Sequence, residues 1–108
     1  MRKAEVLYNG VLAGALTELS PDKYVFRYDD VYFIDPKMPA VSLTLPKTRQ
    51  EYHAERLFPY FYNMLSEGAN RAFQSRLLKI DENDNFGLLL ATAGTDTIGA
   101  ITIKPITE

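Results

Sequence analysis

The hydrophobic and polar positions follow a period of two at the start of the chain, change to helical spacing after residue 52 and return to period two near the end. Asn9-Gly10 separates the apolar-rich runs 5–8 and 11–16, and this dipeptide supplies the two positive-φ residues of a type I′ turn. A β-hairpin is therefore predicted there. After a turn sequence at 20–22, residues 24–28 alternate aromatic with aliphatic or charged side chains, which predicts a half-buried third strand.

Prolines interrupt the middle of the chain. Pro36 and Pro39 lie three residues apart, and because each removes a backbone donor and restricts the residue before it, 35–39 is predicted to be a loop. Residues 41–45 alternate again and are followed by Pro46, which predicts a short strand at an edge of the sheet.

Helical spacing begins with the apolar positions Leu57, Phe58, Phe61, Met64 and Leu65. Pro59 is tolerated only in a first turn, so this helix is predicted to begin near Phe58 and to end or bend at Gly68. A second helix is predicted from the stripe formed by Ala69, Ala72, Phe73, Leu77 and Ile80.

The acidic and amide side chains at 81–85 offer N-caps for a third helix from Phe86 to about Thr92. Gly94 suits the end of that helix, and 98–103 is predicted to be a strand closed by Pro105. Strands, then helices, then a final strand predict a single α+β domain over residues 1–108. It should have a mostly antiparallel sheet with an N-terminal hairpin, about three helices packed on the sheet, and a C-terminal strand.

Composition narrows the class of protein. A chain of 108 residues is long enough for one core but too short for a core and a second catalytic lobe. With a net charge of -2 and scattered cationic residues, direct nucleic-acid binding is not expected. The lack of cysteine excludes disulfides and fits an intracellular protein. No apolar run approaches the ~20 residues that cross a bilayer, and the N-terminus lacks a signal-peptide pattern. A cytoplasmic location is expected.

Candidate catalytic groups are weak. His53 is the only histidine, and His53-Ala54-Glu55 has the spacing of zinc deaminases without their cysteine pair, so a place in an exposed loop or helix start is favoured over a metal role. The segment 84–87, Asp-Asn-Phe-Gly, echoes the kinase Asp-Phe-Gly motif, but no other kinase motif accompanies it and a capping cluster is favoured. The acidic pairs at 29–30 and 81–82 are typical of solvated turns. No catalytic residue, metal or cofactor is predicted.

An aromatic cluster at 58–62 is better suited to recognition. On a helix, Phe58, Phe61, Tyr62 and Leu65 share one face, and core packing is predicted for the two phenylalanines and the leucine. Tyr60 and Asn63 point away from that face. For Tyr60 and Tyr62, a solvated surface and a partner surface both stay open, because amphipathic aromatics are enriched at protein interfaces.

Three ordered segments resemble the N-terminal subdomain of HipA-type toxin kinases. They are the Ser-Leu-x-Leu-Pro segment at 42–46, the run from Phe58 to Gly68, and the run from 87 to 103 with its Gly-x-Asp-x-x-Gly-Ala signature at 94–100, in which Thr95 replaces an arginine. A structural role is favoured for this signature. In HipA-type proteins a much larger kinase domain follows, whereas this chain ends at residue 108. The chain is therefore expected to be that subdomain as a separate small bacterial protein, similar to HipS of tripartite HipB-HipS-HipT toxin-antitoxin systems.

The resemblance places a short loop, 66–71, between the first two helices, where the family has Leu-Pro-Glu-Gly. Ser66 replaces the family's proline, Glu67 offers an acceptor and Arg71 a fork of donors. Ala69 stands where many relatives carry a bulky residue. The expected partner-binding residues are Tyr60, Tyr62, Asn63, Ser66, Glu67, Gly68, Ala69, Asn70 and Arg71.

The resemblance implies a non-catalytic antitoxin that binds and inhibits a separately encoded HipA-like, or HipT, serine/threonine kinase. A HipB-like helix-turn-helix protein would supply the DNA contact through the complex. The alternative is a non-inhibitory structural subunit, or an excised N-terminal subdomain, that mediates HipB binding or dimerisation. An exposed Tyr60 and loop would also allow weak self-association.

Overall fold

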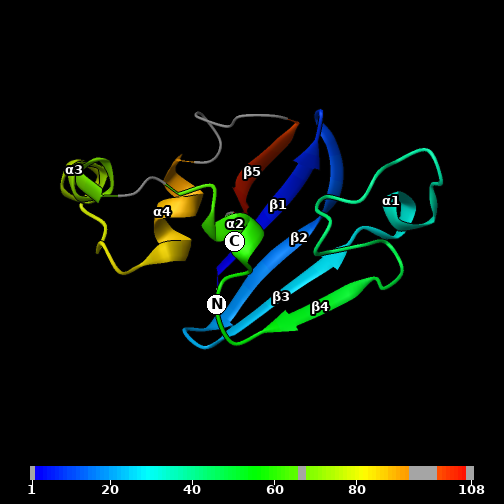
Figure 1. Ribbon diagram of the computed structural model, residues 1–108, viewed down its shortest axis with the longest axis horizontal. Helices are drawn as coiled ribbons and strands as arrows, with labels where there is room; N and C mark the ends of the chain where they lie inside the picture. Colours follow the sequence, from blue (N-terminus) through cyan, green and yellow to red (C-terminus); the bar gives the residue numbers. More distant parts are fainter. Residues whose placement is uncertain (1, 66–67, 93–99, 107–108) are drawn as a thin grey trace.

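The computed structural model describes residues 2–65, 68–92 and 100–106, and a five-stranded antiparallel sheet forms its centre (Figure 1). The strands lie in the order β4-β3-β2-β1-β5. Their bounds are β1 (Arg2–Tyr8), β2 (Val11–Ser20), β3 (Lys23–Tyr28), β4 (Glu51–Ala54) and β5 (Ile101–Ile106). The predicted hairpin is confirmed, since β1 and β2 pair around Asn9 and Gly10, whose φ angles are 47° and 83°. The third strand is confirmed as β3.

Within the described ranges, four helices accompany the sheet: α1 (Asp30–Ile34), α2 (Pro59–Tyr62), α3 (Gly68–Leu78) and α4 (Asn85–Thr92). Both α2 and α4 contribute buried residues to the core on one side of the sheet. In Figure 1, α3 lies beside α4 at one end of the molecule and α1 lies at the opposite end. The predicted α+β class is confirmed. None of the described helices is long and apolar enough to cross a membrane.

The core is built on the inward row of β3. Tyr24, Phe26 and Tyr28 alternate along this strand and are all buried. The ring of Phe26 meets Phe61 of α2 at a centroid distance of 5.8 Å, and the ring of Tyr24 meets Phe86 of α4 at 6.1 Å. Strand β3, in which aromatic residues alternate along one face, therefore packs directly against α2 and α4.

The strand predicted at 41–45 is wrong, because this segment forms turns instead. Val41 and Leu45 are both buried, as expected of alternating residues, but the backbone closes between them through the bond from Leu45 N to Ser42 O, 3.1 Å. The hydroxyl of Tyr28 accepts from Val41 N and donates to Leu45 O. A buried tyrosine supplies the backbone partners that a neighbouring strand would have supplied.

The sequence analysis missed two elements, and several predicted elements have different bounds in the structure. Neither β4 nor α1 was predicted; Asp29 caps α1, its carboxylate accepting from Tyr32 N at 3.4 Å. The predicted helix at Phe58 is present with Pro59 in its first turn, but α2 ends at Tyr62. The last strand does not stop at Pro105, because β5 continues to Ile106 on the edge of the sheet, where a missing N–H costs little.

Candidate functional site

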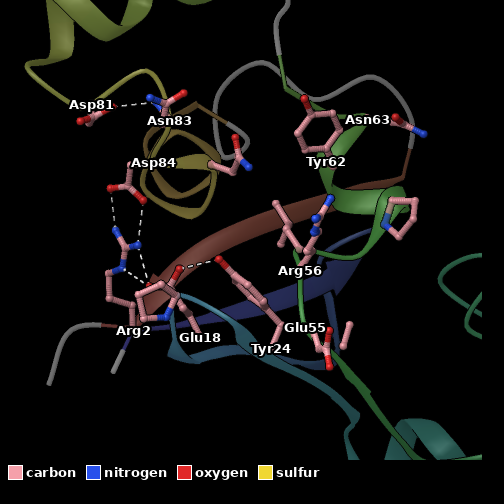
Figure 2. Close-up of a pocket in the computed structure, with 15 residues that line it drawn as sticks. Arg2, Glu18, Tyr24, Glu55, Arg56, Tyr62, Asn63, Asp81, Asn83 and Asp84 are labelled. Atoms are coloured by element: carbon pink, nitrogen blue, oxygen red, sulfur yellow. Dashed lines mark hydrogen bonds and ion pairs between the residues drawn. The ribbon is translucent and has the colours of Figure 1, made fainter.

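A groove of about 1060 Å³ separates α2 from the segment that precedes α4, above one end of the sheet (Figure 2). We call it the α2 groove. Its walls come from the sheet, the 54–63 segment and the 81–85 segment, and its lining residues are Arg2, Glu18, Pro21, Tyr24, Ala54, Glu55, Arg56, Leu57, Pro59, Tyr62, Asn63, Asp81, Asn83, Asp84 and Asn85. Tyr62 and Asn63, predicted to bind a partner, thus lie at this groove.

Strand register assembles one wall of the groove. Arg2 of β1 lies opposite Glu18 of β2, and Glu18 lies opposite Tyr24 of β3, so the three side chains form a row across the sheet. Arg2 donates to Glu18 Oε1 from Nε at 2.9 Å and from Nη2 at 2.7 Å. Tyr24 Oη donates to Glu18 Oε2 at 2.7 Å.

Asp84 joins this row to α4. Its Oδ1 and Oδ2 accept from Arg2 Nη2 and Nη1 at 2.8 and 3.0 Å, and Oδ1 also accepts from Gly87 N at 3.1 Å, which caps the start of α4. The Arg2 guanidinium lies 5.3 Å from the centre of the Phe86 ring. Sequence analysis found the capping role of the 84–87 segment, which is confirmed, but had no signal for its partner 82 residues earlier in the chain.

The bonds shift the pKa values of this cluster. The guanidinium of Arg2 lowers the pKa of the Asp84 carboxyl, and the bond to Asp84 raises the pKa of Arg2. Burial, helped by the bond to Glu18, raises the pKa of Tyr24 to about 12. Arg2 and Asp84 therefore stay charged and paired near neutral pH. Since the carboxylate oxygens of Glu18 and Asp84 already accept bonds from neighbours, the cluster holds the groove together rather than presenting a free base or nucleophile.

The cluster leads to a pH-dependent prediction for Arg2→Met, which keeps the aliphatic stem. At pH 7 the variant should lose about 1–2 kcal/mol of unfolding free energy, because charge-assisted bonds are strong but Arg2 is partly exposed. Asp84 has a lowered folded pKa, so its contribution is present above its unfolded pKa of about 3.9 and is lost as pH falls through the folded value. The difference in unfolding free energy between the wild type and Arg2→Met should therefore become smaller below about pH 4. Urea unfolding at several pH values would show this change.

Arg27→Met is the matched control. Arg27 pairs with Asp30 at 3.1 Å and with Glu51 at 3.8 Å, but its side chain is 52% exposed. That substitution should cost no more than about 0.5 kcal/mol. Equal losses in the two variants, or a pH-independent loss in Arg2→Met, would contradict the role assigned to the cluster.

The structure places the predicted aromatic cluster in two environments. Phe58, Phe61 and Leu65 are buried, which confirms the predicted core packing. Tyr62 is 43% exposed and borders the groove. Tyr60 is half-buried against the core, with its ring centre 5.3 Å from that of Phe61, and burial raises its pKa. Tyr62 is thus the more accessible of the two tyrosines, which corrects the helical pattern: that pattern placed Tyr62 on the face of Phe61 and Tyr60 away from it.

The predicted loop is described only in part. Ser66 and Glu67 lie outside the described residues. Gly68, Ala69 and Asn70 are exposed in the first turn of α3, and Gly68 has a φ of 60°. Residues 94–99 of the predicted signature also lie outside the described residues, whereas the Ala100 carbonyl accepts from Asn9 N at 2.8 Å.

Arg71 has intramolecular partners. Its Nε and Nη2 donate to the Glu82 carbonyl at 3.0 and 2.8 Å, and Nη2 also donates to Asn85 Oδ1. Its guanidinium lies 5.9 Å from the centre of the Tyr62 ring. The structure therefore brings Arg71 and Tyr62 together, with Arg71 joining α3 to the segment before α4.

Other candidate groups have structural partners. His53 is exposed, as expected, but it lies on strand β4 rather than in a loop or helix start, 2.7 Å from Glu51. Asp30 pairs with Arg27, and Asp81 accepts from Asn83 N at 2.8 Å in a turn. Within residues 2–65, 68–92 and 100–106, no three histidine or carboxylate side chains gather as metal ligands would.

Together, the sheet order and the helices that pack on the sheet define a small α+β domain. Residues 4–104 match the HipA N-terminal domain family, and the chain belongs to this family. The matched region is the N-terminal domain and excludes the kinase domain of HipA. The solved N-terminal domain of HipA toxin has the same fold, with a TM-score of 0.73 over 100% of this chain and 95% of that one at 24% identity.

Curated relatives come in two lengths. An uncharacterised protein of Haemophilus influenzae is 31% identical over 104 residues, which cover 96% of this chain and 92% of that protein. The putative kinases Y4dM and Y4mE of Sinorhizobium fredii are 29% and 25% identical, with 94% and 97% of this chain covered. The matches span only 26% and 25% of these kinases, so the chain corresponds to about a quarter of their length.

Proposed function

We propose that this protein is a non-catalytic bacterial antitoxin that binds and inhibits a separately encoded HipA-like serine/threonine kinase in the cytoplasm. The family match over residues 4–104 carries this proposal. A domain that forms about a quarter of the putative kinases in Sinorhizobium is well suited to contact the other three quarters. The Haemophilus relative supports action as a separate protein, because the match covers 92% of its length.

The chemistry of the described residues favours recognition. The charged groups nearest the sheet in the α2 groove are engaged with one another, so they stabilise the groove. Beside them, Tyr62 offers an aromatic face and a hydroxyl, and Asn63 offers an amide; both are exposed. Aromatic and amide groups next to a groove are typical of protein interfaces.

The proposed contact surface consists of Tyr60, Tyr62, Asn63 and residues 66–71. The contact between Tyr62 and Arg71 supports it, since a ring held by a neighbouring guanidinium loses less conformational freedom on binding. Inhibition would follow if this surface covers the nucleotide or substrate cleft of the kinase. In this proposal a HipB-like helix-turn-helix protein supplies the DNA contact, as the net charge of -2 gives this chain no attraction for phosphates.

A second candidate function is a non-inhibitory structural subunit that completes the kinase fold or mediates HipB binding or dimerisation. The relatives Y4dM and Y4mE favour it, because there the domain is part of a longer putative kinase. An inhibitor and a subunit would both bind the kinase, so binding alone does not separate them.

Titration of kinase activity separates the two candidates. The HipA-like kinase encoded in the same genome is mixed with this protein, and phosphorylation and complex formation are measured together. We expect activity to fall to background at one equivalent. The double variant Tyr62→Ala, Asn63→Ala should bind at least about 10-fold more weakly, as truncated central contacts commonly do.

The matched control is Leu43→Ala. Leu43 is fully exposed on the 41–45 turn, outside the lining of the α2 groove, and its loss should leave inhibition unchanged. Tight binding with unchanged or raised kinase activity would reject the antitoxin function and favour the structural subunit. Arg71 is not a suitable probe, because its removal would also release α3 from Glu82.

A further inference from the structure

The apolar side of α3 faces outward. Ala69, Phe73 and Leu77 recur every four residues and form one stripe along the helix. Phe73 is 63% exposed and Leu77 is 68% exposed. No residue of α3 is buried, although sequence periodicity predicts this stripe as the side that packs. We call Ala69, Phe73, Arg76 and Leu77 the outer face of α3.

Polar bonds on the opposite side of α3 set this orientation. Arg71 donates to the Glu82 carbonyl, and Ser75 Oγ donates to the carbonyl of Ile80. These two side chains lie one turn apart and fix both halves of the helix to the segment that leads into α4. The helix thus turns its polar side toward the segment that leads into α4 and leaves its apolar side exposed.

The charged residues of α3 itself are all positive. Helix α3 carries Arg71 and Arg76 but no aspartate or glutamate, and Lys79 follows its end. Arg76 and Lys79 are exposed, and neither has an ion pair among those of the described residues. A matching surface would therefore be apolar in the middle and carry carboxylates at its edge.

We propose that the outer face of α3 docks into an apolar groove with an acidic rim on the kinase. This inference rests on the proposed function and specifies how the partner is recognised. An apolar helix face with anchors four residues apart is the feature that helix-binding grooves select. The chain corresponds to about a quarter of the putative kinases, so the rest of such a kinase is the surface that a side of this domain must meet.

A second copy of this chain fits the outer face less well. A two-fold contact between outer faces would bring Arg76 and Lys79 of the two copies together, and like charges oppose that contact. Val31 and Ile34 on α1 are also exposed, at 72% and 77%, and lie near acidic residues. A head-to-tail contact between α3 of one copy and α1 of the next forms a closed assembly only if the rotation between the copies closes a ring, and otherwise it forms an open filament.

The test compares two pairs of exposed apolar residues at opposite ends of the molecule (Figure 1). Affinity for the HipA-like kinase of the same genome is measured by titration calorimetry for the wild type, Phe73→Ala with Leu77→Ala, and Val31→Ala with Ile34→Ala. We expect each truncated anchor to lower the affinity about 10-fold, so Kd should rise about 100-fold for the α3 pair. The α1 pair should stay within about twofold, because it is outside the proposed contact.

A charge reversal provides a second measurement. Arg76→Glu should weaken kinase binding, and the loss should shrink as salt is raised, since salt screens attraction to an acidic rim. Lys37→Glu, an exposed lysine in the loop after α1, is the matched control and should have little effect. Thermal unfolding checks each variant, and no large change is expected because none of these side chains is buried.

The outcomes separate the two proposals. If the wild type does not bind the kinase, the proposed function and this inference both fail. If the wild type binds and the α3 pair binds equally well, only this inference fails. If the α3 pair binds the kinase normally but loses self-association seen for the wild type by sedimentation, the occupant is a second copy and the inference is again overturned.

Discussion

Phe61→Ala is expected to remove about 3–5 kcal/mol from the free energy of unfolding. Phe61 is fully buried, and its ring lies 5.8 Å from Phe26, 6.3 Å from Phe58 and 5.3 Å from Tyr60. The truncation would leave a cavity between the sheet and α2 that a four-residue helix is poorly placed to fill. Since small domains have only about 5–15 kcal/mol in total, the loss is a large part of the stability. Urea unfolding at neutral pH measures it.

Phe61 should also affect recognition. Helix α2 has four residues, too few to be stable alone, so burial of Phe61 holds it in place. Tyr62 and Asn63 follow directly, and their positions at the groove depend on that anchor. Phe61→Ala should therefore weaken kinase binding even though Phe61 has no exposed surface to touch a partner. Tyr62→Ala, the neighbouring control, should cost less than about 1 kcal/mol of stability. Similar stability losses in both variants would contradict the anchor role.

Tyr28→Phe is expected to lower the free energy of unfolding by about 1–3 kcal/mol, an unusually large effect for the loss of one oxygen atom. The hydroxyl of Tyr28 serves two backbone groups in the core: it accepts from Val41 N at 2.9 Å and donates to the Leu45 carbonyl. Without it, a buried donor and a buried acceptor lose their partner. Urea unfolding should show the loss, and the Val41 amide should exchange its hydrogen faster than in the wild type.

The control is the same substitution at an exposed hydroxyl. Tyr52 Oη donates to the Pro46 carbonyl at 2.5 Å, but water can replace that bond. Tyr52→Phe should therefore change stability by no more than about 0.5 kcal/mol. If Tyr28→Phe is equally mild, the 41–45 segment is held by side-chain packing alone and the assigned hydrogen bonds contribute little.

Local signals predicted the elements that form by themselves. Asn9-Gly10 predicted the hairpin because few other residues reach positive φ, and the alternation at 24–28 predicted β3. Pro59 placed the start of α2 correctly. The strand predicted at 41–45 was wrong because alternation of buried residues also fits a turn whose two ends point inward. Strand β4 was missed because only Tyr52 and Ala54 face the core, too few to show a period.

The candidate site was predicted less completely. The burial of Phe61 agrees with the helical pattern, and the capping role of Asp84 followed from its place before an apolar run. The exposure of Tyr62 does not agree, because helical spacing placed Tyr62 on the same face as Phe61, and α2 ends at Tyr62. No local pattern connects Arg2 with Asp84, because the register of three strands and the placement of α4 bring them together. The internal bonds of Arg71 were missed for the same reason.

The sequence by itself determined the turn at Asn9 and Gly10, the strands β1, β2, β3 and β5, the helices α2, α3 and α4, and, through three ordered segments, the resemblance to the HipA N-terminal domain family that the match over residues 4–104 confirms. These depend on backbone preferences and on motifs that neighbouring residues carry. Only the tertiary structure decided that Arg2 pairs with Asp84, that Tyr28 holds a turn, and that the apolar stripe of α3 faces outward. Periodicity shows that a helix has two sides, but the side that packs is chosen by partners outside the helix, here the Glu82 and Ile80 carbonyls.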